Sequence, residues 1–462
     1  MTDAADRATA NGSERGPAGA SHADGCQPAV LPVADQPVTG QPHGTGQAID
    51  LARVQDAAAR ILPYVRRTPS ELSEPLSELT GRELVLKLEN LQHTGAFKIR
   101  GALSRLLAMP PEQRAAGVIT ASAGNHGLGV ALAARLLGIS ATVVVPTTVP
   151  LAKLTAIQRQ GAEAVLDGPT YDDAHAAAVT LAAERQLTYV HAFDDPYVIA
   201  GQGTVALELI EDGPELDAIV VPVGGGGLIP GIAVAAKALR PNLRVIGVQA
   251  AGSPALAESF REGRLMTAPS STIADGIAVK RPGALAFEII NRLVDDVVTV
   301  DDEAIARAIV LLLERHKLMA EGAGATALAA VLEGAIPARL RRVGVIISGG
   351  NIDPNLLGKV LQQGLASAGR YLAVRTWLDD QPGRLHNLTA LLTTERINII
   401  HISIHRLGPY TGIGKVGLDL IVETRDRAHA LSVLDLIREH GYPAEETIAS
   451  HPPQHGPGAV PL

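Results

Sequence analysis

Lys98 lies in a polar run that could present a primary amine to an aldehyde. The run reads Lys87-Leu-Glu-Asn-Leu-Gln-His-Thr-Gly-Ala-Phe-Lys98-Ile-Arg-Gly101, and its glycine-containing turn leads onto the start of a helix. Most lysines are solvated surface residues, and this is the alternative for Lys98. Lys87 competes with it, but it falls in the alternating segment 83–88, which indicates a strand with a polar outer face. We therefore expect Lys98 to carry chemistry and Lys87 to be structural.

Four consecutive glycines could bind an anion. They follow an apolar segment ending at Val223 and precede a helix predicted over 229–239; they are Gly224, Gly225, Gly226 and Gly227. Glycines leave backbone N–H groups unobstructed, and such groups at a helix N-terminus attract negative charge. The alternative is a flexible turn, but four glycines there would carry a heavy entropic cost without a ligand. A phosphate, with a charge of about −1.5 to −2, suits this loop.

Two further loops carry hydroxyl and amide groups after apolar segments. Ser122-Ala-Gly-Asn-His-Gly127 opens a helix, so its donors could hold a carboxylate, and Ser122 could also cap that helix. Ser348-Gly-Gly-Asn351 follows the apolar segment 343–347. Ser348 could act only as a cap, or its hydroxyl could be the neutral hydrogen-bond partner of a pyridine nitrogen. The local pattern favours neither.

The elements that would position these loops are short apolar strands separated by helix-length stretches. The predicted strands are 117–121, 141–146, 162–166, 218–223, 243–248 and 343–348. This order predicts an α/β fold with buried parallel sheets covered by helices. Ligands bind at the carboxyl ends of such strands, which is where the glycine and serine loops fall.

The ends of the chain have a different composition. Residues 1–48 are rich in Ala, Gly, Pro, Asp and Gln, with almost no large apolar residue, which predicts a disordered tail. Structure is expected from Ile49, with Asp50 capping a helix over 51–64. After Gly369 the pattern becomes βαββα with a weak final strand near 444–448, which is typical of a small ferredoxin-like unit. Residues 450–462 are a second Pro- and Gly-rich tail.

Composition excludes several classes of protein. A chain of 462 residues with net charge −8 and 3% aromatic residues lacks the basic, aromatic surface of a nucleic-acid-binding protein. The apolar stretch 128–145 is interrupted by Arg135, Gly138 and Ser140, so it predicts a helix and a strand and not a membrane span. The one cysteine, Cys26, has no partner for a disulfide, and the first residues lack a secretion signal. We expect a cytoplasmic protein without membrane or nucleic-acid partners.

Taken together, these motifs resemble threonine dehydratase (threonine ammonia-lyase), of the fold-type II pyridoxal-phosphate-dependent family. The resemblance runs from about 49 to 442 and rests on the Lys98 run, Ser122-Ala-Gly-Asn-His, Asp194-Asp-Pro, Ala200-Gly-Gln-Gly-Thr, the four glycines, Ala274-Asp-Gly-Ile-Ala, Glu321-Gly-Ala-Gly-Ala and Ser348-Gly-Gly-Asn. It implies a two-subdomain catalytic domain over 49–368 and an ACT-like regulatory domain over 369–449.

The resemblance also implies residue roles. Lys98 would bond the cofactor, pyridoxal 5'-phosphate, and take the Cα proton of the substrate. The other cofactor-binding residues would be Phe97 at the ring, Asn125 at the ring oxygen, Gly224 to Gly227 at the phosphate and Ser348 at the ring nitrogen, while Ser122, Ala123, Gly124, Asn125 and His126 would hold the substrate carboxylate. The implied reaction converts L-threonine to 2-oxobutanoate and ammonium, and L-serine to pyruvate. A neutral Ser348 hydroxyl would not keep the ring nitrogen protonated, which favours β-elimination over transamination.

Two departures narrow the choice within the family. Serine racemases, which the chain also resembles, carry a second base where this chain has Ala123, and a methyl group cannot move a proton. Their divalent-cation loop here reads Gln249-Ala-Ala-Gly-Ser-Pro-Ala255, without carboxylates, so no metal is expected, although Glu321 could help hold a monovalent ion.

Several questions stay open at this level. The alternatives are a serine or hydroxyaspartate dehydratase and, far less favoured, an amino-acid sensor without chemistry. The resemblance implies a branched-chain amino-acid effector, isoleucine or valine, at an interface between ACT-like units, hence a homo-oligomer, either a dimer or a tetramer. Whether the role is isoleucine biosynthesis or amino-acid breakdown is not determined.

Overall fold

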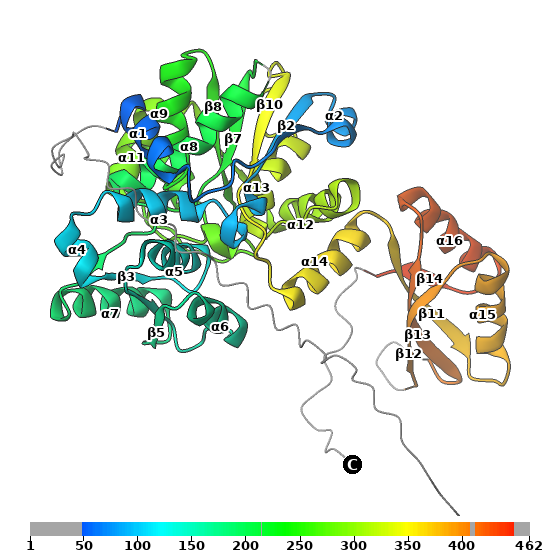
Figure 1. The fold of residues 1–462 in the computed structure, drawn as a ribbon. Coiled ribbons are helices and arrows are strands. Elements are labelled where there is room, and N and C mark those ends of the chain that lie inside the picture. Colours follow the sequence, from blue (N-terminus) through cyan, green and yellow to red (C-terminus); the bar gives the residue numbers. More distant parts are fainter. Residues whose placement is uncertain (1–48, 214, 407–411, 448–462) are drawn as a thin grey trace, which may run out of the picture. The chain divides into compact units, whose positions relative to one another are not determined.

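The computed structural model describes residues 49–213, 215–406 and 412–447. The predicted tails, 1–48 and 450–462, lie outside these residues. Within them, no helix is long and apolar enough to cross a membrane. Two parallel sheets covered by helices form the region before residue 369, and an antiparallel sheet follows it (Figure 1).

The smaller parallel sheet has the strand order β5-β4-β3-β6. Its strands are β3 (Val118–Ala121), β4 (Ala141–Val145), β5 (Glu163–Leu166) and β6 (Thr188–Tyr189). Helices α3 (Lys98–Leu107) and α5 (Asn125–Leu137) pack on one face, and α7 (Tyr171–Glu184) packs on the other. Helices α4 (Pro111–Ala116) and α6 (Leu151–Arg159) complete this subdomain. Because both faces are covered, β3 and β4 are buried along their whole length.

The larger sheet has the order β1-β2-β10-β7-β8-β9 and is parallel except at β1. Its strands are β1 (Ser70–Leu72), β2 (Glu83–Leu88), β7 (Ala218–Pro222), β8 (Arg244–Ala250), β9 (Asp296–Val300) and β10 (Arg342–Ile347). Alternate residues enter two cores: Ala218 and Val220 of β7 lie in one, and Ile219 and Val221 lie in the other.

The helices of the larger subdomain form a layer on each side of this sheet. Helices α2 (Glu74–Thr80), α12 (Asp302–Leu311), α13 (Gly322–Leu332) and α14 (Pro354–Ser367) contribute to the first core. Helices α1 (Leu51–Ile61), α8 (Pro196–Asp212), α9 (Ile229–Leu239), α10 (Ala255–Glu262) and α11 (Ala284–Leu293) contribute to the second. Asp50 caps α1 as predicted, accepting a hydrogen bond from the backbone N–H of Arg53 at 2.9 Å.

The C-terminal unit has the predicted βαββαβ order. It comprises β11 (Tyr371–Asp379), α15 (Arg384–Thr394), β12 (Ile399–His405), β13 (Lys415–Glu423), α16 (Arg427–Glu439) and β14 (Ala444–Glu446). The sheet order β12-β13-β11-β14 is antiparallel, and its core holds Leu372 and Val374 of β11. Trp377, opposite Gly417 of β13, lies on the other face of the sheet.

The predicted polar outer face of residues 83–88 was wrong. Strand β2 lies between β1 and β10, and Lys87 is fully buried. Its amine donates to the backbone carbonyl of Thr68 at 2.6 Å and to the Glu208 carboxylate at 2.7 Å. Lys87 is therefore structural, as expected, but as an interior ion pair. The alternating pattern misled because a lysine with a carboxylate partner can occupy an interior position of a strand covered on both faces.

Candidate active site

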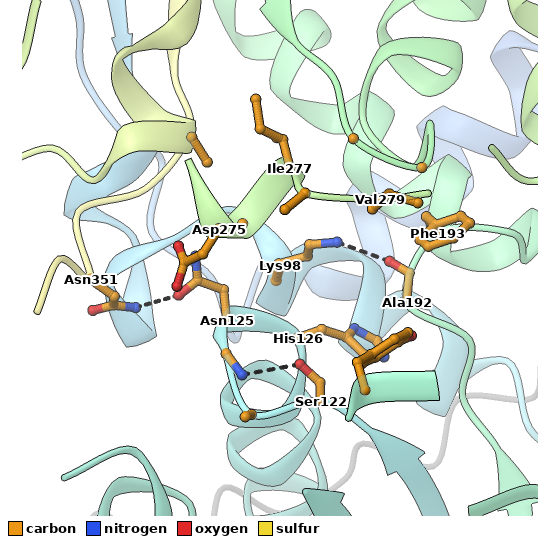
Figure 2. Close-up of a pocket in the computed structure, with 18 of the residues that line it drawn as sticks. Lys98, Ser122, Asn125, His126, Ala192, Phe193, Asp275, Ile277, Val279 and Asn351 are labelled. Carbon is orange, nitrogen blue, oxygen red and sulfur yellow. Dashed lines mark hydrogen bonds between the residues drawn. The ribbon is translucent and has the colours of Figure 1, made fainter. Parts of the chain in front are cut away.

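Lys98 is the first residue of α3, and its amine faces a cavity of about 930 Å³ between the two parallel sheets. The Nζ atom donates to the backbone carbonyl of Ala192 at 3.0 Å (Figure 2). Burial lowers the pKa of Lys98 to about 8, although the nearby Glu321 carboxylate opposes this shift. The neutral, nucleophilic amine is therefore far more populated at neutral pH than in an ordinary lysine.

The turn before Lys98 is joined to the Ser348 loop. Phe97 N–H donates to the Ser348 carbonyl at 3.2 Å, and Gly350 N–H donates to the Gly95 carbonyl at 2.9 Å. The turn itself uses left-handed backbone at Thr94, with φ of 64°, and at Gly95, with φ of 71°. These bonds fix the loop that carries the amine against the loop that carries the Ser348 hydroxyl.

Helix α3 is anchored by a buried ion cluster two residues beyond Lys98. The Arg100 guanidinium is fully buried and donates two hydrogen bonds of 2.8 Å to the equally buried carboxylate of Glu89. It also donates to Glu208 at 2.7 Å, and Glu208 in turn accepts from Lys87. Two cations and two carboxylates thus neutralise one another and tie α3 to β2 and α8.

The four-glycine loop joins β7 to α9 and lies against other segments of the chain. A Cβ on Gly227 would lie 2.7 Å from the Cβ of Phe193, and Gly226 has φ of +98°. Packing therefore demands glycine here in addition to any ligand, which corrects the argument from entropy alone. No side chain among the described residues caps α9, so the backbone N–H groups of Ile229 and Gly231 are available to an anion, whereas Pro230 has no N–H to offer.

The Ser122–His126 loop lines the same cavity and leads into α5. Ser122 Oγ accepts from Gly124 N–H at 3.2 Å and does not cap the helix. The His126 ring is buried, and burial lowers its pKa to about 3. Its Nε2 lies 3.1 Å from the Val190 carbonyl, so Nε2 carries the hydrogen and the ring is neutral. Any carboxylate held by this loop would rely on hydroxyl and backbone donors and not on an imidazolium.

Asn125 is held by two neighbours. Its Nδ2 donates to Glu321 Oε1 at 2.6 Å, and its Oδ1 accepts from Asn351 Nδ2 at 2.7 Å (Figure 2). Glu321 is buried at the start of α13; its burial and the nearby Asp275 raise the pKa of its carboxyl to about 7. The hydroxyl of Ser348, which is also buried, donates one long hydrogen bond of 3.4 Å to the Ala323 carbonyl.

Every residue predicted to bind cofactor or substrate lines this single cavity. They are Phe97, Lys98, Ser122, Ala123, Gly124, Asn125, His126, Gly224 to Gly227 and Ser348. The cavity therefore brings together the Lys98 amine, the four-glycine loop, the Asn125 amide and the Ser348 hydroxyl. This set of groups suits a phosphorylated heterocycle that carries an aldehyde.

Sequence reasoning missed other residues of the cavity. His191, Ala192 and Phe193 follow β6, which has only two residues and gives no recognisable strand pattern. Their position at the carboxyl end of a parallel strand is the signal that could have identified them. Glu321 was considered only for an ion, and Asn351 only as part of a motif.

Comparisons with known proteins agree with this arrangement. Residues 61–349 match the model of the pyridoxal-phosphate dependent enzyme family. The L-threonine ammonia-lyases of Thermotoga maritima and Geobacter sulfurreducens are 43% and 46% identical, over 85% and 84% of this chain and 98% and 97% of theirs. The structure of maize serine racemase superposes with a TM-score of 0.65 at 38% identity, covering 70% of this chain and 99% of the racemase.

Proposed function

The chain belongs to the family of pyridoxal-phosphate-dependent enzymes, and on this premise we propose that it deaminates L-threonine to 2-oxobutanoate and ammonium. L-Serine, giving pyruvate, is the proposed second substrate. The observation that carries the proposal is the Lys98 amine, with a pKa of about 8, in one cavity with the glycine loop and a neutral Ser348 hydroxyl. The L-threonine ammonia-lyases that match nearly end to end support the choice of substrate.

The cofactor is held in this proposal by residues from both subdomains. Backbone N–H groups of Gly224 to Gly227 and of the α9 N-terminus would bind the phosphate, Asn125 would meet the ring oxygen and Ser348 the ring nitrogen. Pyridoxal phosphate, when bound, supplies an aldehyde for the amines and a ring that withdraws electrons from Cα of the substrate.

In this proposal the side chains of the protein move one proton and hold the negatively charged carboxylate of the substrate. Lys98 Nζ, which donates to the Ala192 carbonyl, would take the Cα proton, and the electron pair of that bond would form the Cα–Cβ double bond as the Cβ hydroxyl leaves. The protonated amine would return a proton to the leaving hydroxyl, so that water departs. The released enamine then tautomerises and hydrolyses to 2-oxobutanoate and ammonium. Ser122 and the backbone donors at the start of α5 hold the substrate carboxylate, because His126 is neutral. The Ser348 hydroxyl carries no charge that would keep the ring nitrogen protonated, which favours elimination.

A keto-acid assay with L-threonine, L-serine and hydroxyaspartate tests the substrate, and Lys98→Ala tests the base. We expect threonine to give the highest kcat/KM and Lys98→Ala to lose turnover while remaining folded, with Lys359→Ala, on the exposed side of α14, as the matched control. Greater kcat/KM for serine or hydroxyaspartate would replace the proposed substrate. Substantial threonine deamination by Lys98→Ala would refute the role of Lys98. Buried Lys87 does not line the cavity, so the next candidates would be the other lysines that do, Lys153 and Lys280.

For residues 369–449 we propose a regulatory ACT-like domain that binds isoleucine or valine at an interface between two subunits of a dimer or tetramer. The match to the Thermotoga maritima enzyme spans 85% of the chain and so must extend past residue 369. The turn Asp379-Asp-Gln-Pro-Gly383 leads into α15, and its backbone donors could meet a carboxylate there. Gly383 has φ of +89°, and no side chain among the described residues caps α15. The proposed compartment is the cytoplasm.

Effector titrations test this domain. Coupling of about 1 to 3 kcal/mol would move the threonine saturation curve by roughly 5- to 150-fold. A chain ending at Gly369 should keep the chemistry at Lys98 and lose the response. An intact enzyme whose kinetics ignore isoleucine, valine and other small amino acids would leave the domain a structural or dimerisation role.

A further inference from the structure

The orientation of the Asn125 amide can be traced to the backbone carbonyl of Thr94, which can only accept hydrogen bonds. The backbone carbonyl of Thr94 lies 2.6 Å from Asn351 Nδ2, and a carbonyl has no hydrogen to donate. The Asn351 atom that faces Thr94 must therefore be nitrogen. The same Nδ2 has a second hydrogen, which it donates to Asn125 Oδ1 at 2.7 Å.

This direction is transmitted to Asn125. Because Asn351 presents a donor, the Asn125 atom that meets it must be the amide oxygen. The Asn125 nitrogen then points to Glu321 Oε1, 2.6 Å away, and uses one of its two hydrogens there. The Glu321 carboxyl keeps an acceptor oxygen whether or not it is protonated, so the direction does not depend on its charge.

The second Asn125 hydrogen has no acceptor among the hydrogen bonds of the described residues, and Asn125 lines the cavity beside Lys98. An N–H donor at this place suits an anionic oxygen. If the amide were reversed, its carbonyl would face the same space and would repel that oxygen.

The backbone departs from ordinary geometry where this chain of bonds starts. Thr94 is β-branched and yet adopts φ of 64°, a region that such residues rarely occupy. At Gly95, where φ is +71°, a Cβ would lie 2.6 Å from Asn351 Oδ1, so any other residue would strain the backbone and displace the Asn351 amide. Strained backbone of this kind persists where surrounding structure enforces it, and it gathers at functional sites.

We propose that Asn351 is a positioning residue: guided by the Thr94 carbonyl, it fixes the Asn125 amide so that an N–H group faces the ring oxygen of the cofactor. The inference rests on the proposed function, which places that oxygen at Asn125. It assigns Asn351 no contact with substrate and no proton transfer. Its effect is to favour the ionised form of the ring oxygen, and so to strengthen cofactor binding.

Two substitutions of Asn351 test this with the full-length chain. Asn351→Asp keeps the size but offers only acceptors to Thr94 and Asn125, so it should reverse the Asn125 amide, and Asn351→Ala removes the bonds without adding charge. The readouts are the affinity of the cofactor-free protein for pyridoxal phosphate, by equilibrium dialysis, and the absorbance of the bound cofactor. The ionised ring oxygen absorbs in the violet and the neutral one in the near ultraviolet.

We expect both Asn351 variants to shift absorbance from the violet to the near-ultraviolet band and to lose roughly ten- to hundredfold in affinity, the size of one charge-assisted hydrogen bond. Asn355→Asp, on exposed α14, makes the same change of charge nearby and should behave as the unmodified chain. If the spectra of both Asn351 variants were unshifted, the inference about Asn351 would be wrong, but the proposed function would stand. An unmodified chain that captures no cofactor would overturn the proposed function and the inference together.

Discussion

The pKa of Lys98 makes capture of the cofactor by the cofactor-free protein depend on pH in a defined way. Only the neutral amine attacks an aldehyde. With a pKa of about 8, roughly one lysine in ten is neutral at pH 7, against about one in three thousand for an ordinary lysine with a pKa of 10.5. Burial thus raises the reactive fraction by about 300-fold.

The assay is the rate at which cofactor-free protein gains the absorbance of bound pyridoxal phosphate, measured from pH 6.5 to 10. We expect the rate to rise about tenfold per unit below pH 8 and to level off above it, because the lysine is then already neutral. The control is lysine amide acetylated only at its α-amine, in the same buffers. Its free ε-amine should react with pyridoxal phosphate at a rate that keeps rising to pH 10.

The Glu321 carboxylate opposes the shift at Lys98, so Glu321→Gln should move the midpoint below pH 8 and speed capture at pH 7. Gln keeps an oxygen for Asn125, which separates this effect from the orientation of that amide. A rate that still climbs tenfold per unit between pH 9 and 10 would refute the reasoning, since it would mean that the cavity does not lower the pKa.

Three further outcomes follow from the structure. Arg100→Met should cost about 3 to 5 kcal/mol of unfolding free energy in urea titrations, because it leaves the buried Glu89 carboxylate without its counter-ion while Glu208 keeps Lys87, and a loss below about 1 kcal/mol would contradict this. Gly227→Ala should weaken cofactor binding in equilibrium dialysis, because the added methyl group would push on Phe193, whereas Gly358→Ala, at an open helical position, should leave binding unchanged and add up to about 1 kcal/mol of stability in thermal melts. If the two variants had the same cofactor affinity and the same stability, the four-glycine loop would not be the phosphate site. Because Ala123 cannot donate a proton, L-serine should yield pyruvate with little D-serine, and comparable amounts of the two by chiral chromatography would show that another group serves that face.

The loops that meet at the cavity could be predicted from the sequence. Each follows an apolar strand that is recognisable locally, and ligands bind at the carboxyl ends of parallel strands. All the predicted site residues, from Phe97 to Ser348, line this cavity. The strands β1, β6 and β9 were missed: β1 and β6, of three and two residues, are too short to show a pattern, and β9, Asp296–Val300, is only partly buried and less uniformly apolar.

Side-chain partnership could not be predicted. The interior ion pair of Lys87 depends on Glu208, which lies far along the chain, and periodicity carries no information about such a partner. Likewise Asn351 and Asn125 are 226 residues apart, on the Ser348 loop and at the start of α5, and only the tertiary fold brings them together. Single-chain patterns report burial and period, whereas these contacts depend on tertiary packing.

Trp377 gives the molecule a built-in optical label. It is the sole tryptophan in the sequence, and it lies on β11 of the C-terminal unit, on the sheet face away from the helices' core. Emission excited at the red edge of protein absorbance therefore originates in that unit alone, while the visible colour of a bound cofactor would originate at Lys98. The C-terminal unit and the site at Lys98 can thus be followed in the same sample. If a small molecule changed the Trp377 fluorescence before the cofactor absorbance, it would act first on the C-terminal unit, and no added dye would be needed to show this.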